Sequence, residues 1–375
     1  MAYLDYNATA PLRPAVMEAM TAVLGATGNA SSVHRSGRRA RRAIEAARRQ
    51  VAALVRADPE RVVFTSGGTE ANNLALSALP GRALVSAVEH PSVLRAAGDG
   101  AAIPVDAHGV VDLEALARLL ADVDGPVVVS VMAANNETGV LQPIAEAARI
   151  AHEAGAFFHC DAVQAAGRID LDIDGLGADA MTLSAHKLGG PQGVGCLVFR
   201  GDRIPAPMLK GGTQEKGWRA GTENLPGIVG FGVAAEEAVA DLGRTPALAA
   251  MRDRLEREAL AAVPGAAVLG ADAPRVATTS CLAMPGVASE TQVIALDLAG
   301  VEVSAGAACS SGKVHRSHVL DAMGVPEPIA ESAIRVSLGW ASEAADIDAF
   351  LAAWAATYAR AGGGAKMNRE EAATA

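Results

Sequence analysis

One lysine stands at the end of a short apolar run, where a charged amine is unusual. Residues 180–184 are AMTLS, typical of a buried strand, and the chain continues through Ala185 and His186 to Lys187 and a glycine-rich turn. Lysine is almost never fully buried unless something offsets the cost. One offset is a Schiff base with an aldehyde such as pyridoxal 5′-phosphate (PLP), whose phosphate Ser184 and His186 could hold. The alternative is a strand-end lysine whose long stem reaches solvent, and this segment alone leaves both interpretations open.

A glycine-rich turn between a strand and a helix suggests a phosphate site. It spans residues 65–70, with the sequence TSGGTE. Gly67 and Gly68 would let the backbone approach a phosphate closely, and the following helix would offer unpaired N–H groups at the positive end of its dipole. Many such turns are only helix caps, so by itself the turn is a weak indication.

Two further strand ends carry polar residues that suit the same cofactor. Asp161 closes the apolar run FFHCD, and it could pair with a protonated pyridine nitrogen while Gln164 bonds the ring hydroxyl. A helix cap explains Asp161 equally well. His90 follows another strand and could stack on the ring and transfer protons, although a single histidine there is more often structural. In an open α/β sheet, ligands bind beyond the carboxyl ends of the strands. The glycine-rich turn, Asp161 and His90 would all lie there.

Strand-like and helix-like segments alternate through most of the chain. Continuous apolar runs separated by amphipathic segments predict βαβ units and a mostly parallel sheet covered by helices on both faces. We therefore predict a large α/β domain over residues 16–250. Residues 1–15 and 251–362 are expected to form a smaller α+β domain, and residues 363–375 a flexible tail. The predicted strands lie at residues 61–65, 83–88, 126–134, 156–162, 180–185 and 195–199.

Composition and charge exclude several classes of protein. The 375 residues are 50% apolar and 20% charged, as in a globular protein, and the net charge of −10 disfavours a general affinity for nucleic acid or anionic membranes. The basic cluster Arg35–Arg49 is best interpreted as the solvated face of an amphipathic helix, with a tRNA-contacting surface as the alternative. No apolar stretch is long enough to span a bilayer, and the N-terminus shows no signal peptide.

The four cysteines predict free thiols rather than a disulfide framework or a metal site. They form no CxxC pair and no zinc spacing, so we expect a reducing cytoplasm. Cys160, Cys196 and Cys281 lie in apolar runs and fit the usual buried thiol. Cys309 differs, because it lies in VSAGAACSSG, a stretch of small residues and glycine that suggests an exposed loop.

The joint occurrence and order of these segments is a demanding pattern. The sequence resembles the class V, fold-type I PLP enzymes, specifically the cysteine desulfurases of the NifS/IscS type, from residue 3 to about residue 355. The long form of the cysteine segment, before SHVLDAMG, resembles the IscS/NifS subgroup rather than the SufS subgroup. The motifs that carry the resemblance are TSGGTEANNLAL, VEHPSV, ANNETGVLQPI, FHCDAVQAAG, LSAHKLGGPQGVG, RAGTENLPG, SAGAACSSG and IRVSLG.

The resemblance implies a role for each matched residue around the cofactor ring. Lys187 would be the Schiff-base lysine and would later carry a proton between the substrate α-carbon and the cofactor. Asp161 would pair with the pyridinium nitrogen, Gln164 would bond the phenolic oxygen, and His90 would stack over the ring. The fold implied is that of fold-type I PLP enzymes, in which the smaller domain carries the catalytic cysteine.

The phosphate and the substrate would be bound by other matched residues. The resemblance gives the phosphate to the backbone of Gly68 and Thr69 and to the side chains of Thr69, Ser184, His186 and Thr222. The residue that matches Thr222 reaches into the partner subunit's site, so a homodimer is implied. Asn136 would contact the cofactor, and Asn136 and Arg335 would bind the substrate carboxylate, since a guanidinium can grip both oxygens at once.

These roles imply a cysteine desulfurase that converts L-cysteine to L-alanine and leaves the sulfur on Cys309 as a persulfide. A sulfur-acceptor protein would receive it for iron–sulfur cluster assembly or for thiolation of tRNA or cofactors. No metal site, no membrane and no direct nucleic-acid binding is expected. The alternatives are a selenocysteine lyase or another class V PLP enzyme and, from a different class, a non-catalytic sulfur carrier or scaffold.

Overall fold

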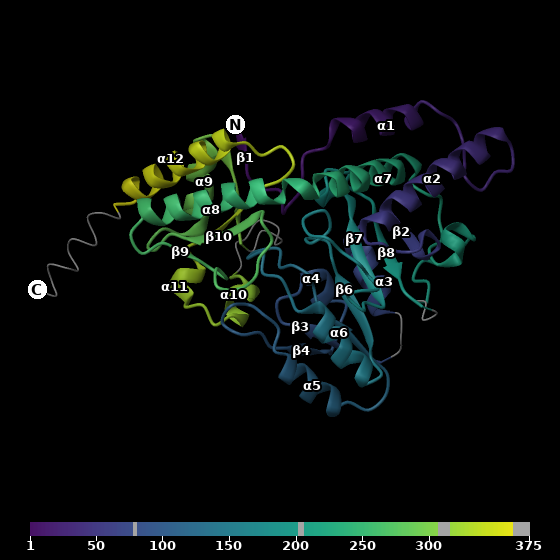
Figure 1. Cartoon of the computed structure of the whole chain (residues 1–375), viewed down its shortest axis with the longest axis horizontal. Coiled ribbons are helices and arrows are strands. Elements are labelled where there is room, and N and C mark those ends of the chain that lie inside the picture. Colours follow the sequence, from purple (N-terminus) through teal and green to yellow (C-terminus); the bar gives the residue numbers. More distant parts are fainter. Residues whose placement is uncertain (78–80, 202–205, 307–315, 363–375) are drawn as a thin grey trace, which may run out of the picture.

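The computed structural model describes residues 1–77, 81–201, 206–306 and 316–362 (Figure 1). Cys309 and the predicted tail, residues 363–375, therefore lie outside the described residues. In the described part of the chain, no helix is long and apolar enough to cross a membrane.

A seven-stranded sheet forms the larger part of the fold. The strand β8, which is second from one edge, pairs antiparallel with both of its neighbours, and all the other pairings are parallel. This arrangement confirms the predicted α/β class with a mostly parallel sheet. The strand β4 was not predicted, because its three residues are too short a run to be recognised. The order across the sheet is β2 (Val62–Thr65), β8 (Gly195–Phe199), β7 (Ala180–Ser184), β6 (Phe157–Asp161), β5 (Val127–Ser130), β3 (Arg82–Ser86) and β4 (Ala101–Ile103).

Helices cover both faces of this sheet, which explains why its strands are apolar throughout. Successive side chains of a strand point to opposite faces. Phe64 belongs to the core beneath one group of helices, whereas its neighbour Val63 belongs to the core on the opposite face. The first group contains α2 (Arg35–Leu54), α5 (Leu113–Ala121), α6 (Ile144–Glu153) and α7 (Leu225–Ala240), and α1 (Pro14–Leu24) packs against α7. The second contains α3 (Gly68–Leu76) and α4 (Pro91–Leu94).

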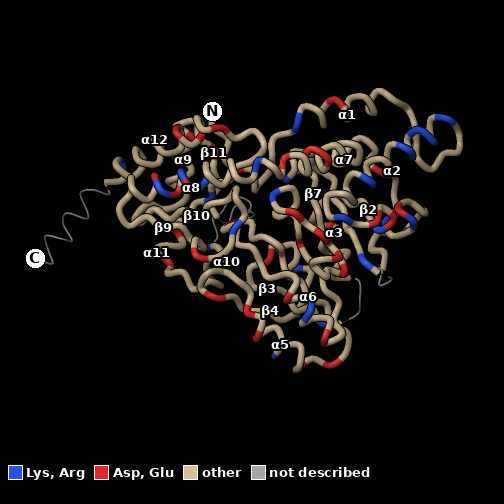
Figure 2. The backbone as a smooth tube through the Cα atoms, in the orientation of Figure 1, with Lys and Arg blue, Asp and Glu red and all other residues tan. Residues whose placement is uncertain are grey.

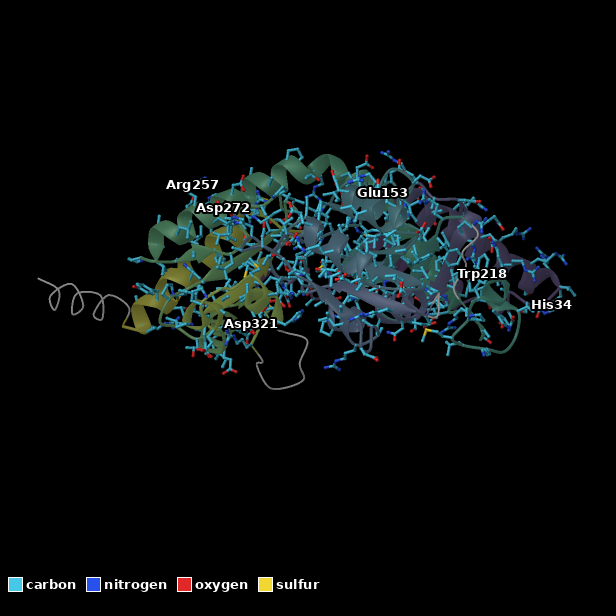
Figure 3. The ribbon with its side chains drawn as sticks, turned by 90° about the horizontal axis from the view of Figure 1, so that it is seen from below. His34, Glu153, Trp218, Arg257, Asp272 and Asp321 are labelled. Carbon is cyan, nitrogen blue, oxygen red and sulfur yellow. The ribbon has the colours of Figure 1, made fainter. Side chains whose placement is uncertain are left out.

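The basic helix α2 behaves as predicted, with one exception. Most of its arginines are exposed, and Figure 2 shows basic residues along its outer end. Arg48 is buried instead and forms a bidentate ion pair with Glu215, with distances of 2.7 and 2.8 Å. Figure 3 shows the packed side chains from below, with His34 marking the end of the molecule near α2.

The remaining elements form a second sheet and its helices. The four-stranded order is β12 (Ser304–Ala305), β13 (Ala333–Ser337), β10 (Thr279–Ala283) and β9 (Ala267–Val268), with antiparallel pairs throughout. The N-terminal β1 (Ala2–Tyr3) pairs in parallel with β11 (Val301–Glu302). Packed around them are α8 (Thr245–Ala262), α9 (Ser289–Leu298), α10 (His318–Ala322), α11 (Glu327–Ala330) and α12 (Ala344–Arg360).

The first residues of the chain belong to the core of this second part. Leu4 is fully buried and lies in one cluster with Leu282, Phe350 and Trp354. Beyond Leu4, the chain crosses to the end of the large sheet, and it returns to the second part only through α7, the short η4 (Asp241–Arg244) and α8. The exact domain limits proposed from the sequence stay a proposal.

Candidate active site

A cavity of about 340 Å³ lies where the strands of the large sheet end. This is the place at which ligands bind in open α/β sheets. Predicted site residues from the turns after β2, β3, β5, β6 and β7 line it, together with one residue from β13. They are Gly68, Thr69, His90, Asn136, Asp161, Gln164, Ser184, His186, Lys187 and Arg335.

The Lys187 amine points at the N-terminal segment from the cavity wall. Lys187 ends the single turn η2 (Ala185–Lys187), which follows β7 directly. Its Nζ donates hydrogen bonds to the carbonyl oxygens of Asn7, at 2.5 Å, and Ala8, at 2.6 Å. The amine is therefore held inside the site by two backbone acceptors, in place of the solvent-directed orientation that the strand-end alternative describes.

Asn7 is a site residue that the sequence analysis did not single out. It is 2% exposed, and its carbonyl oxygen accepts from both Lys187 and the Gln164 Nε2, the latter at 3.0 Å. Its side-chain Nδ2 donates to the carbonyl of Asn136 and to Thr279, both at 3.0 Å, and its Oδ1 accepts from Arg168 at 2.6 Å. Asn7 thus joins the lysine to three segments that are distant in the sequence.

Asp161 is linked to His90 by two residues that the sequence analysis also missed. Asn72 donates its Nδ2 to Asp161 Oδ2 at 2.7 Å and to Ser92 Oγ at 2.9 Å. Ser92 contacts His90 Nδ1 through its hydroxyl at 2.8 Å and through its backbone N–H at 3.1 Å. Asp161 Oδ1 also accepts from the backbone N–H of Val163, at 3.0 Å, so the carboxylate stabilises the following turn as well.

His90 is a neutral imidazole at neutral pH. Its pKa is lowered, chiefly by burial; Asp161 acts in the opposite direction, and the neighbouring Lys187 and His318 lower the pKa further. Because the backbone N–H of Ser92 donates to Nδ1, that nitrogen is the acceptor and Nε2 carries the proton. The ring therefore enters the cavity as an uncharged donor.

Four of the predicted phosphate residues, Gly68, Thr69, Ser184 and His186, line the cavity, and the first two begin α3. Gly67 has φ of 154° and no side chain, which directs the backbone into the helix whose first residue is Gly68. A Cβ at position 68 would lie 3.2 Å from Val163 Cγ2, so a side chain there would be crowded. Burial, with the charge of Lys187, lowers the pKa of His186 to about 4. At neutral pH His186 is therefore an uncharged hydrogen-bonding group.

Arg335 approaches the cavity from β13 with part of its guanidinium already engaged. It is 3% exposed, and its Nη2 lies 2.8 Å from Asp5 Oδ1. Its Nη1 donates to the carbonyl of Asn136 at 3.1 Å. Asp5 was not predicted as a site residue, because its partner is 330 residues away in the sequence.

A buried acid, Glu89, stands next to the cavity residue His90. Glu89 is fully buried, and its Oε1 accepts from the backbone N–H of Met132 at 2.5 Å. Burial, with the nearby charge of Asp161, raises the pKa of Glu89 well above its ordinary value. The charged form of Glu89 is therefore disfavoured beside Asp161.

Three buried polar atoms on residues that line this cavity have no hydrogen-bond partner among the described residues. They are Asn72 Oδ1, Gln164 Oε1 and Arg335 Nε. Since buried polar atoms are nearly always paired, this cluster indicates a cavity formed to bind a polar ligand. A carboxylate for a pyridinium nitrogen, a helix N-terminus for a phosphate, a lysine amine for an aldehyde and a guanidinium for a carboxylate are the groups that PLP and an amino acid require.

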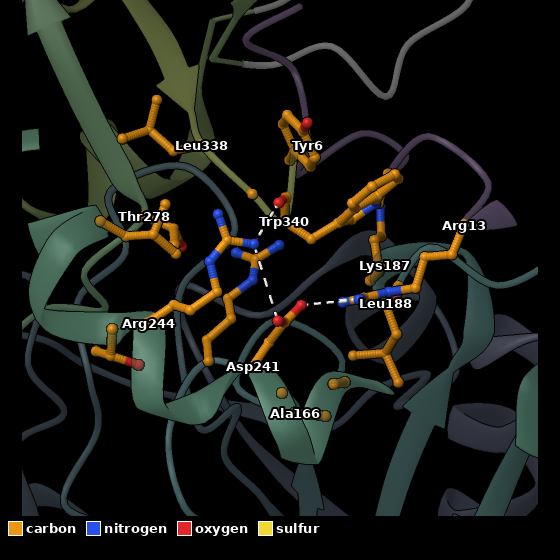
Figure 4. A pocket seen from close by; sticks show the side chains of 17 residues that line it. Tyr6, Arg13, Ala166, Lys187, Leu188, Asp241, Arg244, Thr278, Leu338 and Trp340 are labelled. Atoms are coloured by element: carbon orange, nitrogen blue, oxygen red, sulfur yellow. Dashed lines mark hydrogen bonds and ion pairs between the residues drawn. The ribbon is translucent and has the colours of Figure 1, made fainter. Parts of the chain in front are cut away.

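A smaller neighbouring cavity cannot hold such a ligand. Figure 4 shows this space of about 50 Å³, which shares Lys187 with the larger cavity. Its volume corresponds to one or two water molecules at roughly 30 Å³ each. Arg13 and Asp241 form an ion pair of 2.8 Å across it, and Arg244 donates to the carbonyl of Trp340 at 2.6 Å. The first contact joins the N-terminal segment to η4, and the second joins η4 to the segment after β13, so both belong to the scaffold.

Two predicted residues are not part of the cavity. Thr222 lies beside a separate pocket of about 130 Å³, with Ser66 and Arg219, so its assignment to a partner subunit's site stays a prediction. Cys309 lies outside the described residues. Cys160, Cys196 and Cys281 are buried free thiols as predicted, and burial raises the pKa of each of them.

Comparison with known proteins gives consistent matches along nearly the whole chain. Residues 2–350 match the family described as class V aminotransferase. A cysteine desulfurase of Cereibacter sphaeroides is 46% identical over 365 residues, which are 93% of each chain. An IscS-like cysteine desulfurase of Mycobacterium tuberculosis is 42% identical and covers 96% of this chain and 97% of its own.

A solved structure agrees with these relatives. The NifS-like protein of Rickettsia africae superimposes with a TM-score of 0.89 and 37% identity, covering 96% of this chain and 99% of its own. Members of this family use PLP as cofactor, and the groups around the 340 Å³ cavity fit it. The chain therefore belongs to the class V aminotransferase family of PLP enzymes, within the group that contains the NifS-like and IscS-like cysteine desulfurases.

Proposed function

We propose that this chain is a cysteine desulfurase, which removes the sulfur of L-cysteine and releases L-alanine. Relatives that carry this name match more than 90% of the chain at 42–46% identity. The observation that carries the proposal is one cavity that contains the amine of Lys187, the carboxylate of Asp161 and the guanidinium of Arg335.

PLP, when bound, supplies an aldehyde that condenses with amines and a ring that accepts negative charge from the substrate α-carbon. Lys187 would bind the aldehyde carbon through Nζ and later hold the proton taken from the α-carbon. Asp161 would hold the pyridine nitrogen in its protonated form, and Asn72 keeps that carboxylate in place through its 2.7 Å hydrogen bond. His90, neutral and a donor at Nε2, would lie against the ring.

The phosphate would bind at the first turn of α3. The backbone N–H groups of Gly68 and Thr69 are exposed there at the positive end of the helix, and the hydroxyl of Ser184 and the neutral ring of His186 line the same cavity. Thr222 would complete the phosphate site from a second copy of the chain. We therefore propose that the active protein is a homodimer.

Arg335 and Asn136 would bind the substrate carboxylate. Asp5 and the carbonyl of Asn136 hold the guanidinium from one side, and Arg335 Nε is buried with no partner in the part of the chain that the structure describes. A substrate carboxylate would satisfy that donor, which fixes the α-carbon relative to Lys187. An amino acid without a free carboxylate should therefore bind poorly.

Cys309 would take the sulfur. Its thiolate would attack the sulfur of bound cysteine, so that a new S–S bond forms and the substrate Cβ–S bond breaks. The electron pair of the broken bond stays with the substrate carbon, which takes up a proton to become the methyl group of alanine. We propose that the persulfide then passes to an acceptor protein for iron–sulfur cluster assembly or for thiolation of tRNA or cofactors, in a reducing cytoplasm that keeps these thiols free.

Incubation of the PLP-loaded protein with L-cysteine tests the proposal. We expect L-alanine in amounts equal to the sulfur released, a mass increase of one sulfur atom on Cys309, and loss of both products in Lys187→Ala. Alanine formation from selenocysteine that persists in Cys309→Ala would instead indicate a selenocysteine lyase. A protein that shows no visible cofactor absorbance after loading with PLP would be a non-catalytic carrier or scaffold.

A further inference from the structure

A buried carboxyl group lies directly beside the substrate site without a role in the chemistry proposed above. Glu137 follows Asn136 in the turn between β5 and α6, and it is 2% exposed. Its Oε2 accepts a hydrogen bond of 2.5 Å from the hydroxyl of Ser317. Ser317 is also the N-cap of α10, where its oxygen accepts from the backbone N–H of Leu320 at 3.2 Å.

The same oxygen of Glu137 lies close to a second chain segment. Gly306 lies against it so closely that a Cβ at position 306 would be 2.9 Å from Glu137 Oε2. Gly306 and Ser317 stand on the two sides of residues 307–315, which include Cys309. One carboxyl group therefore lies beside Gly306, shortly before the residue proposed to take the sulfur, and bonds to Ser317, shortly after it.

Neighbouring contacts join both flanks to residues of the substrate and cofactor site. On the first side, Ser304 donates its hydroxyl to Asp5 Oδ2 at 2.8 Å, and Asp5 pairs with Arg335. On the second side, His318 Nε2 lies 2.9 Å from the carbonyl oxygen of Glu89, the residue before His90. Of the residues in these contacts, Glu137 is the one that lies beside both flanks, at Gly306 and at Ser317.

We propose that Glu137 is a positioning residue for sulfur transfer, which fixes the chain on both sides of residues 307–315 against the turn that contains Asn136. This inference rests on the proposed function, because it assigns Glu137 to the step that Cys309 performs. It assigns no chemistry to Glu137 itself. In its absence, the substrate and cofactor would still bind, whereas the thiol would meet the substrate sulfur less often.

The electrostatic surroundings of Glu137 make the contact dependent on pH. Burial raises the pKa of Glu137 to about 7, while the hydrogen bond from Ser317 and the charge of Arg335 act in the opposite direction. Among the described residues, Arg335 on β13 and Cys281 on β10 are the titratable groups that interact with it. A charged acceptor forms the stronger hydrogen bond, so the contact with Ser317 strengthens as the pH rises through 7.

The test compares Glu137→Gln and Ser317→Ala with wild type as PLP-loaded full-length proteins. Two rates are measured from pH 6 to 8.5 by mass spectrometry: persulfide formation on Cys309 with one equivalent of cysteine, and alkylation of Cys309 by iodoacetamide without substrate. The change of cofactor absorbance on adding cysteine reports substrate binding. Glu290→Gln removes an exposed charge near Gly306, and Asp112→Ala removes the N-cap of a different helix, α5. These are the matched controls.

We expect persulfide formation to fall at least tenfold in both variants, with cysteine binding changed less than threefold. The alkylation rate should change at least threefold. The pH profile of this rate should show an inflection near pH 7 in wild type and in both controls, and Glu137→Gln should lose it. Alkylation rates and pH profiles equal to wild type in both variants would overturn the proposal, whether or not the protein desulfurates cysteine. A wild type that forms no persulfide while the alkylation differences persist would overturn the proposed function and leave the positioning role supported.

Discussion

The cofactor half and the substrate half of the site are built in different ways. The cofactor half takes its residues from the ends of neighbouring parallel strands, so each side chain is placed by the sheet a few residues away. The substrate half is assembled from the N-terminal segment, the turn after β5 and strand β13, which meet only through long-range contacts. One half therefore depends on local geometry, and the other depends on how the two parts of the chain pack.

This difference predicts that removal of a cofactor-half group abolishes the reaction while the fold persists. Lys187→Ala should lower turnover by roughly 10⁴-fold or more, because both the covalent attachment and the proton transfer depend on Nζ. The far-ultraviolet circular dichroism should stay that of wild type. Measurement of alanine formation checks this, and turnover within tenfold of wild type would refute the role of the lysine.

Changes in the substrate half should affect substrate binding before cofactor binding. Arg335→Lys keeps the positive charge and loses the planar fork that Asp5 and the carbonyl of Asn136 hold. We expect kcat/KM for cysteine to fall about 10²–10³-fold, equivalent to about 3–4 kcal/mol, with PLP affinity unchanged. Steady-state kinetics and a PLP titration decide this; an equal loss of PLP affinity would show that the two halves are not separable.

Asn7 belongs to both halves, so its loss should reduce stability. Asn7→Ala would leave the buried guanidinium of Arg168 without its acceptor and the carbonyl of Asn136 without one of its donors. An unsatisfied buried group costs about 1–3 kcal/mol, so we expect a loss of roughly 2–5 kcal/mol. Urea unfolding of the PLP-free protein measures it, with exposed Asn29→Ala as the control; equal losses in both variants would contradict the joining role.

The smallest expected effect concerns the pH dependence of stability. Because the folded-state pKa of Glu137 is raised to about 7 from its ordinary 4.5, the folded state binds more protons than the unfolded state between these values. The free energy of unfolding therefore falls as the pH rises through this window. Glu137→Gln removes that contribution, so its stability relative to wild type should rise by roughly 2–3 kcal/mol from pH 5 to pH 8. If the difference in unfolding free energy between the variant and wild type stayed constant across this range, the raised pKa of Glu137 would be contradicted.

The same contrast explains what could be predicted from the sequence. Asp161, His90 and Lys187 each follow an apolar run, and the rule that ligands bind beyond strand ends places them together without any knowledge of tertiary contacts. The mostly parallel sheet followed from the same runs. Strand β4 was missed because three residues carry too little pattern.

Residues whose importance arises from contacts between distant segments could not be predicted. Nothing in the extended N-terminal sequence indicates that the carbonyl of Asn7 receives the Lys187 amine, 180 residues away. Asp5 meets Arg335, 330 residues away in the sequence, because the N-terminal segment bridges to Ser337 at the end of β13. Arg48 follows the pattern of exposed arginines on α2, yet it is buried because Glu215 lies opposite it. In each case the partner, and not the residue type, determines the role.

Reduction of the PLP-loaded protein with borohydride, followed by peptide mass spectrometry, tests the central claim most directly. Borohydride converts a lysine–cofactor imine into a stable secondary amine. Our account predicts the phosphopyridoxyl mass on the peptide that contains Lys187 and on no other lysine peptide, and its absence in Lys187→Ala. A label on a different lysine, or no label on protein that has taken up the cofactor, would contradict it.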